Sequence, residues 1–114
     1  MTTIQDTLRS FGITRCYKGF QYAAYAIQLA VEDESRLEAI TKEIYEETAE
    51  HFGCNGAAVE RSIRTVVDRA WKIDSRLLRE IAGYNLDRIP TASEFIEIMA
   101  THILRSSYEL HSLL

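Results

Sequence analysis

Apolar residues recur along this chain at the spacing that gives an α-helix one apolar face. Between residues 18 and 31, for example, Phe20, Ala23, Ile27 and Ala30 lie three or four positions apart. Similar spacing predicts further helices over residues 36–40, 41–52, 57–71 and 74–82, and a last helix that begins at about residue 91. Because only one proline and five glycines interrupt the chain, we predict an all-α fold of about six helices.

Polar residues mark several helix ends. The acidic run 32–35 separates the first two helices, and Thr41 is a candidate N-cap for the helix over residues 41–52. The longest predicted loop covers residues 84–90. Thr91 and Glu94 then form a capping box, in which the Thr91 hydroxyl accepts from the Glu94 amide and the Glu94 carboxylate reaches back.

The run Gly53-Cys54-Asn55-Gly56 joins two predicted helices at the centre of the chain. Glycine and asparagine tolerate a positive φ, so this run can end one helix in a left-handed residue and turn sharply into the next. Ala49 is small where the helices approach, and Val59 and Ile63 are placed to bury the second helix against the first. This pattern is typical of a helix-turn-helix.

The second helix of this unit, residues 57–71, has one apolar and one exposed side at about 100° per residue. The exposed side comprises Ala57, Arg61, Arg64, Thr65 and Asp68. Arg61 and Arg64 project together, and an arginine guanidinium can donate two hydrogen bonds to the O6 and N7 atoms of guanine in the major groove. Glu60, at the edge, can accept from a cytosine amino group or orient an arginine, and Thr65 can meet a phosphate or a thymine methyl group.

A plainer interpretation of these side chains stays open. An arginine at an exposed helix position is often merely solvated, and Glu60 and Arg64 form an i,i+4 pair that stabilises a helix by a few tenths of a kcal/mol.

The overall charge argues against a nucleic-acid partner, but its distribution does not. The 114 residues, enough for one domain, carry 13 Lys and Arg against 17 Asp and Glu, a net charge of −4. Residues 57–72 hold four cations, including Arg69 and Lys72, against two carboxylates, which is a net charge of +2. Residues 34–52 hold two cations against six carboxylates, a net charge of −4. The acidity therefore lies outside the predicted recognition helix.

Other classes of protein find little support in the sequence. Cys16 and Cys54 have no partners at zinc-ligand spacing, and two cysteines so far apart do not indicate a disulfide framework. We predict no metal and no cofactor. The N-terminus has no signal-peptide pattern, and no apolar run is long enough to span a membrane, so we expect a cytoplasmic protein.

Catalysis and ligand binding are likewise not indicated. The histidines at positions 51, 102 and 111 have no nucleophile or acid at motif spacing, and no glycine-rich phosphate loop exists, so we expect no enzyme. The aromatic residues Tyr17, Phe20, Tyr22 and Tyr25 are interpreted as core or interface rather than as a ligand pocket.

Five ordered runs in the chain carry a family resemblance. They are Tyr17-Lys18-Gly19-Phe20-Gln21-Tyr22, Ile40-Thr41-Lys42-Glu43-Ile44-Tyr45, Val59-Glu60-Arg61-Ser62-Ile63-Arg64, Ala70-Trp71 and Pro90-Thr91-Ala92-Ser93-Glu94-Phe95-Ile96. Together they resemble the DNA-binding effector domain of the sporulation initiation response regulators, the stage zero sporulation protein A family. The similarity extends from about Gly12 to Arg105.

The resemblance implies a six-helix domain that binds tandem DNA elements as a homodimer, with Glu60, Arg61 and Arg64 reading the major groove. Two departures from the family pattern imply that some phosphate contacts are missing. Ala57 and Ala58 stand where relatives commonly have polar or basic residues, and His102 stands where a basic residue is expected. The expected DNA-binding residues are Glu60, Arg61, Arg64, Thr65, Asp68, Lys42, Ala57 and Ala58, with Lys42 contributing equally to all DNA sequences.

The predicted domain organisation is a lead-in over residues 1–11, a DNA-binding domain over 12–106 and a tail or helix extension over 107–114. Because Met1 lies about ten residues before the similarity, we expect a free-standing protein without a receiver domain, and phosphorylation control is not transferred. The competing hypothesis is an interaction module that does not bind DNA but dimerises with, or titrates, a full-length regulator.

Overall fold

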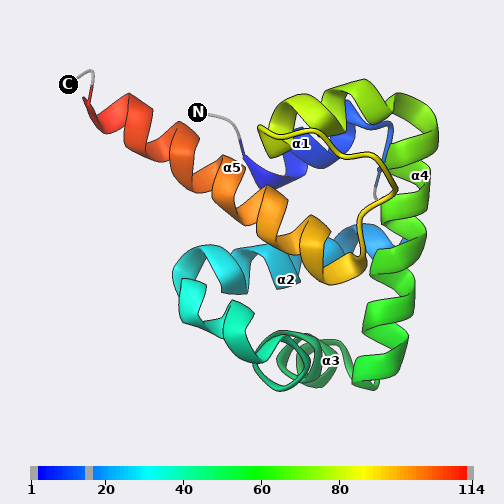
Figure 1. Ribbon diagram of the computed structural model, residues 1–114. Coiled ribbons are helices and arrows are strands. Elements are labelled where there is room, and N and C mark those ends of the chain that lie inside the picture. The colour runs from blue at the N-terminus through cyan, green and yellow to red at the C-terminus, as the bar shows by residue number, and fades with distance from the viewer. Residues whose placement is uncertain (1–2, 15–16, 113–114) are drawn as a thin grey trace.

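The computed structural model describes residues 3–14 and 17–112, with side chains placed as far as Ser106. Every regular element within these ranges is a helix, so the predicted all-α class is confirmed (Figure 1). The elements are α1 (Ile4–Ser10), α2 (Lys18–Glu32), the 3₁₀-helix η1 (Glu34–Ala39), the π-helix η2 (Thr41–Glu46), α3 (Glu47–Phe52), α4 (Gly56–Ala82) and α5 (Ala92–Ser112).

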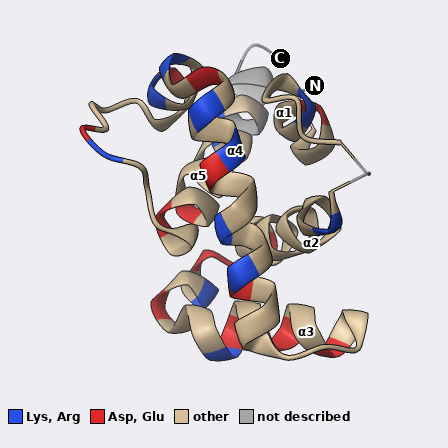
Figure 2. Cartoon of the chain, turned by 90° about the vertical axis from the view of Figure 1, so that its right-hand side faces the viewer, with Lys and Arg blue, Asp and Glu red and all other residues tan. Residues whose placement is uncertain are grey.

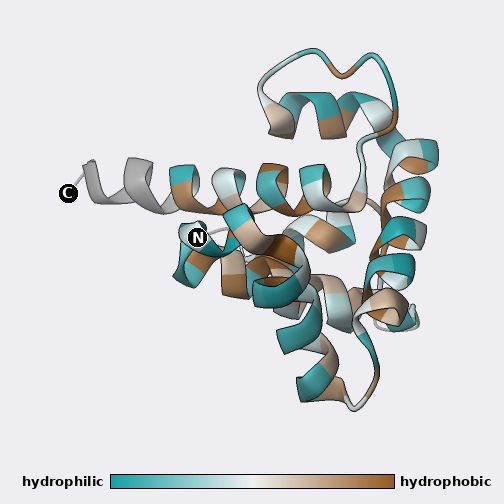
Figure 3. Cartoon of the chain, turned by 60° about the horizontal axis from the view of Figure 1, so that its bottom comes forward, coloured by the Kyte–Doolittle hydropathy of each residue, from teal (hydrophilic) through white to brown (hydrophobic). Residues whose placement is uncertain are grey.

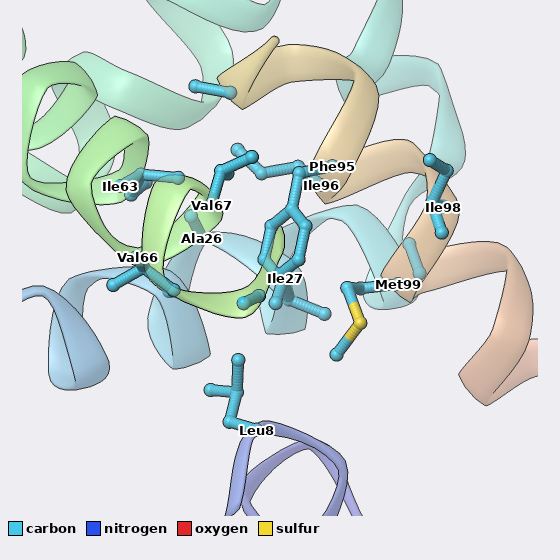
Figure 4. Close-up of a cluster of buried hydrophobic side chains, with 14 of the residues drawn as sticks. Leu8, Ala26, Ile27, Ile63, Val66, Val67, Phe95, Ile96, Ile98 and Met99 are labelled. Carbon is cyan, nitrogen blue, oxygen red and sulfur yellow. The ribbon is translucent and has the colours of Figure 1, made fainter. Parts of the chain in front are cut away.

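The core forms where α2 packs against α4 and α5. Fully buried side chains from these helices, among them Ile27, Ile63, Phe95 and Met99, meet in one cluster, and Leu8 of α1 closes one side (Figure 4). The buried face of α2 also carries small residues, including Ala23 and Ala26, which let neighbouring helices approach closely. Figure 3 shows the apolar faces of the helices turned inward and the hydrophilic faces turned to solvent.

The start of α2 lies directly on α4. A Cβ atom built on Gly19 would lie only 2.6 Å from the backbone carbonyl oxygen of Ser62 and 2.7 Å from Val66. Only glycine fits this contact without a shift of one helix, because real Cβ atoms essentially never come so close to another heavy atom. Gly19 therefore fixes the distance between α2 and the helix that carries the predicted recognition face.

Residue Asp74 divides α4 into two helices. Its φ of −157° and ψ of 77° are not helical, and its carboxylate accepts a hydrogen bond from the Leu77 amide at 2.9 Å, as an N-cap does. The separate helices predicted over residues 57–71 and 74–82 are thus confirmed, although the chain passes between them without a loop.

The N-terminal segment, expected to be a lead-in, contains a helix. Its side chains Ile4 and Leu8, with Phe11 just after it, are buried in the core. The Thr3 hydroxyl caps α1 by accepting from the Asp6 amide at 3.0 Å. Seven residues offer too few turns for a periodic pattern to stand out in the sequence, and a helix so short is stable only because tertiary contacts bury its apolar side.

Thr41 is not the N-cap that its position predicts. The preceding residue, Ile40, already has helical angles of φ −59° and ψ −37°, and no side chain caps η2. The break lies earlier, at Asp33. Its backbone is extended, and its carboxylate accepts a hydrogen bond from the Ser35 amide at 3.1 Å at the start of η1. A residue inside a continuous helical path cannot act as an N-cap, because that role requires a non-helical backbone.

Candidate nucleic-acid interface

The helix-turn-helix consists of η2 and α3, a short turn, and the first part of α4. Gly53 ends α3 in the left-handed region (φ 71°, ψ 38°), and the Cys54 amide donates to the carbonyl of Ala49 at 2.9 Å. Asn55 then caps α4, because its side-chain oxygen accepts from the Ala58 amide at 2.8 Å. The predicted turn over residues 53–56 is therefore confirmed.

The two helices of this unit pack as their sequences predict. Ala49 is 3% exposed at the approach of the helices, and Val59 and Ile63 are fully buried. Tyr45 of η2 is also buried, and burial, followed by the nearby Glu60 carboxylate, raises its pKa to about 12. Tyr45 consequently remains a neutral packing residue beneath the recognition helix, which we define as residues 56–73 of α4.

The outer face of the recognition helix is accessible. Two residues at its edges, Ala58 and Glu60, are half-buried. The five side chains expected on this face are all exposed, namely Ala57, Arg61, Arg64, Thr65 and Asp68. The Arg64 guanidinium is paired with the Glu60 carboxylate at 2.5 Å, so the i,i+4 pair of the plainer interpretation does exist. Arg61 makes no ion pair with any residue that the structure describes, and its backbone carbonyl accepts a hydrogen bond from the Thr65 hydroxyl at 3.2 Å.

A hollow of ≈ 410 Å³ lies along one side of this face. It is bounded by Glu60, Arg64 and Asp68 of the recognition helix and, opposite them, by residues 89–92 at the start of α5. The sequence did not predict these neighbours. Although the Pro90-Thr91 signal located the start of α5, nothing local to it indicates that this helix end lies beside the recognition helix.

Several hydrogen bonds hold the loop before α5 in this position. The predicted capping box is present: the Glu94 amide donates to the Thr91 hydroxyl at 3.2 Å and the Thr91 amide donates to the Glu94 carboxylate at 3.0 Å. Arg88 donates to the same carboxylate at 3.0 and 3.3 Å. The Thr91 backbone amide and then Arg88 lower the pKa of Glu94. The loop is thus fastened to the helix that it precedes.

The first helix of the unit presents an acidic surface. Lys42 is exposed on η2 as expected, but carboxylates follow it at 43, 46, 47 and 50. Figure 2 shows this separation of charge, with acidic residues gathered on η1, η2 and α3 and Lys and Arg distributed along α4.

The aromatic residues near the start of α2 belong largely to the packing. Phe20 and Tyr22 are buried, while Tyr25 is half-buried and stacks on the exposed His51 ring at a centroid distance of 4.2 Å. An open groove of ≈ 450 Å³ nevertheless lies beside Tyr25 and Phe52.

Among the described side chains, no group that could hold a metal ion occurs. Cys54 is a free thiol. The side chains of Cys16 and His111 lie outside the described part of the chain.

The family model described as "sporulation initiation factor Spo0A C terminal" matches residues 4–103. The chain belongs to this family. The Spo0A C-terminal family consists of DNA-binding domains of transcription regulators, not of enzymes, so DNA is the partner of this class of protein. The match begins at the first residue of α1 and ends within α5, and therefore includes the entire helix-turn-helix. None of the described helices is long and apolar enough to cross a membrane.

Proposed function

We propose that this Spo0A C-terminal family member binds specific double-stranded DNA sequences, with the recognition helix in the major groove. One observation carries the proposal. Arg61 and Arg64 stand together, exposed, on the outer face of the second helix of a helix-turn-helix. A guanidinium in the major groove can bind guanine through two hydrogen bonds, a contact worth about 1–3 kcal/mol of discrimination against another base.

The neighbouring residues have narrower roles in this proposal. Glu60 orients Arg64 through the ion pair between them, or accepts from a cytosine amino group when Arg64 moves to a base. Thr65 meets a phosphate or a thymine methyl group, and Asp68 borders the face beside Arg64. Ala57 and Ala58, at the N-terminal end of the helix, offer only apolar contact, and Lys42 binds the DNA backbone without regard to sequence.

The charge distribution supports a binding mode that needs paired sites. With an acidic surface on the first helix of the unit, few cations are available for phosphate contacts, so affinity for random DNA should be weak. We therefore propose binding as a homodimer on tandem sites, since two linked contacts raise the apparent affinity without new side chains.

The test starts from duplexes that the protein itself selects from a random-sequence library. Fluorescence anisotropy then measures binding to a selected duplex and to a random duplex of equal length. We expect Arg64→Ala to lower affinity for the selected duplex by roughly 5-fold to 150-fold, the equivalent of about 1–3 kcal/mol, with little effect on the random one. Lys42→Ala should weaken both duplexes alike.

Two outcomes would contradict the proposal. One is a library that yields no enriched sequence. The other is an enriched duplex to which the wild type, Arg61→Ala and Arg64→Ala bind equally. Either result would favour the interaction module, whose binding to a full-length regulator of the family would then be measured by the same method.

A further inference from the structure

The outer face of the recognition helix is divided lengthwise into two stripes of different charge. The first stripe lies beside the loop at residues 89–92, and its charges alternate in sign, since Glu60 and Asp68 lie four residues to either side of Arg64. The second stripe, which we call the cationic stripe, carries no carboxylate. It consists of the exposed residues Arg61, Thr65, Arg69 and Lys72.

The start of α2 borders the cationic stripe. The contact of Gly19 with the Ser62 carbonyl brings the neighbouring residues Tyr17 and Lys18 next to the recognition helix, and Lys18 is exposed. Figure 2 shows Lys and Arg along α4, and α2 adds one lysine, Lys18. The cations near this border therefore come from two helices.

Arg69 is held in place at this border by an aromatic ring. Its guanidinium carbon lies 5.3 Å from the centroid of the Tyr17 ring, within the range of a cation–π contact. A guanidinium has five N–H donors, so a contact with one ring leaves donors available for another partner. No carboxylate of the described residues pairs with Arg69, in contrast to Arg64, which is bonded to Glu60.

We propose that Arg69, positioned by Tyr17 and assisted by Lys18, binds the phosphates of the DNA strand that borders the major groove on the α2 side. The proposal rests on the proposed function and adds to it a sequence-independent anchor. A guanidinium with a free edge suits a phosphate, to which it can donate two parallel hydrogen bonds. The opposite border is less suited to phosphate because two carboxylates, on Glu60 and Asp68, line it.

The first test measures the salt dependence of binding for Arg69→Gln. The matched control is Arg76→Gln, which removes the same charge from α4 beyond the kink, where the Arg76 side chain is 90% exposed. For Arg69→Gln, we expect the slope of log affinity against log salt to fall by about 0.9 for each bound protomer, on both the selected and the random duplex. The loss of affinity that Arg69→Gln causes should therefore shrink by about 3.5-fold per bound protomer between 50 and 200 mM salt. Arg76→Gln should retain the wild-type slope.

The second test asks whether Tyr17 acts through Arg69. Tyr17→Leu should weaken binding to the random duplex, and Tyr17→Phe, which keeps a ring beneath the guanidinium, should not. Tyr17 also packs against the core, so Tyr17→Leu could weaken binding without involving Arg69. The affinity for the random duplex is therefore also measured for Arg69→Gln with and without Tyr17→Leu, and the two values should be equal.

The outcomes separate this inference from the proposed function. If the wild type binds the selected duplex but Arg69→Gln behaves like Arg76→Gln, only the phosphate anchor is wrong. If Tyr17→Leu weakens binding equally with and without Arg69, Tyr17 does not position it. A wild type that binds no duplex contradicts both proposals.

Discussion

Arg61 and Arg64 lie three residues apart on one helical face, yet their side chains differ in their ion pairing. Arg64 is bound to Glu60, whereas Arg61 has no ion-pair partner among the described residues. An exposed pair of this kind is worth about 0–1 kcal/mol, which is less than a base contact offers. The Glu60 carboxylate should therefore orient the Arg64 side chain without preventing it from exchanging to a base.

Glu94 provides a prediction at the same scale, in the loop that borders the recognition helix. Because the Thr91 amide and Arg88 lower the pKa of Glu94 in the folded protein, the ionised carboxylate stabilises the fold. This contribution is complete above the ordinary value of 4.5 and is lost as the pH falls through the lower pKa of the folded state.

We therefore expect the wild type to exceed Glu94→Gln in free energy of unfolding at neutral pH, with the difference shrinking below about pH 4.5. Urea unfolding at a series of pH values measures this difference in free energy of unfolding. The control is Glu97→Gln, which replaces an exposed carboxylate on the same helix. A difference that does not depend on pH would rule out the ionised carboxylate as its source.

At the scale of elements, the turn of the helix-turn-helix depends on one backbone conformation. Gly53 has a φ of 71°, and a Cβ atom added to it would have no neighbour within 4 Å. Any cost of a side chain at this position is therefore backbone strain rather than a clash.

We expect Gly53→Ala to lower the free energy of unfolding by about 1–2 kcal/mol, the penalty for an L-residue in the left-handed region. Gly53→Asn should cost less, because asparagine visits this region more readily. Thermal and urea unfolding followed by circular dichroism provide the measurement. Equal costs for the two substitutions would contradict the assignment to backbone strain.

For the whole molecule, the contact between α2 and α4 sets how the recognition helix is supported. Gly19 permits the close approach that also brings Tyr17 to Arg69. Stability of the fold and placement of the proposed phosphate anchor thus depend on the same glycine.

We expect Gly19→Ala to destabilise the protein by about 1–3 kcal/mol, as overpacking does, and to weaken DNA binding as α2 moves away from α4. Gly56→Ala is the matched control, since its added Cβ would lie 3.5 Å or more from its neighbours and its φ is not positive. Unfolding by urea and anisotropy on the selected duplex measure the two effects. If both variants are equally stable, the α2–α4 contact is looser than its geometry indicates.

The sequence by itself determined the helices from residue 18 onward, the turn at Gly53 and the accessible face with Arg61 and Arg64, because periodicity and capping act within a few residues of the chain. The tertiary structure alone decided what surrounds that face. The burial of α1, the position of Thr91 beside Glu60 and the placing of Tyr17 beneath Arg69 join residues far apart in the chain. Such contacts depend on how whole helices pack, and no local pattern of residues encodes them.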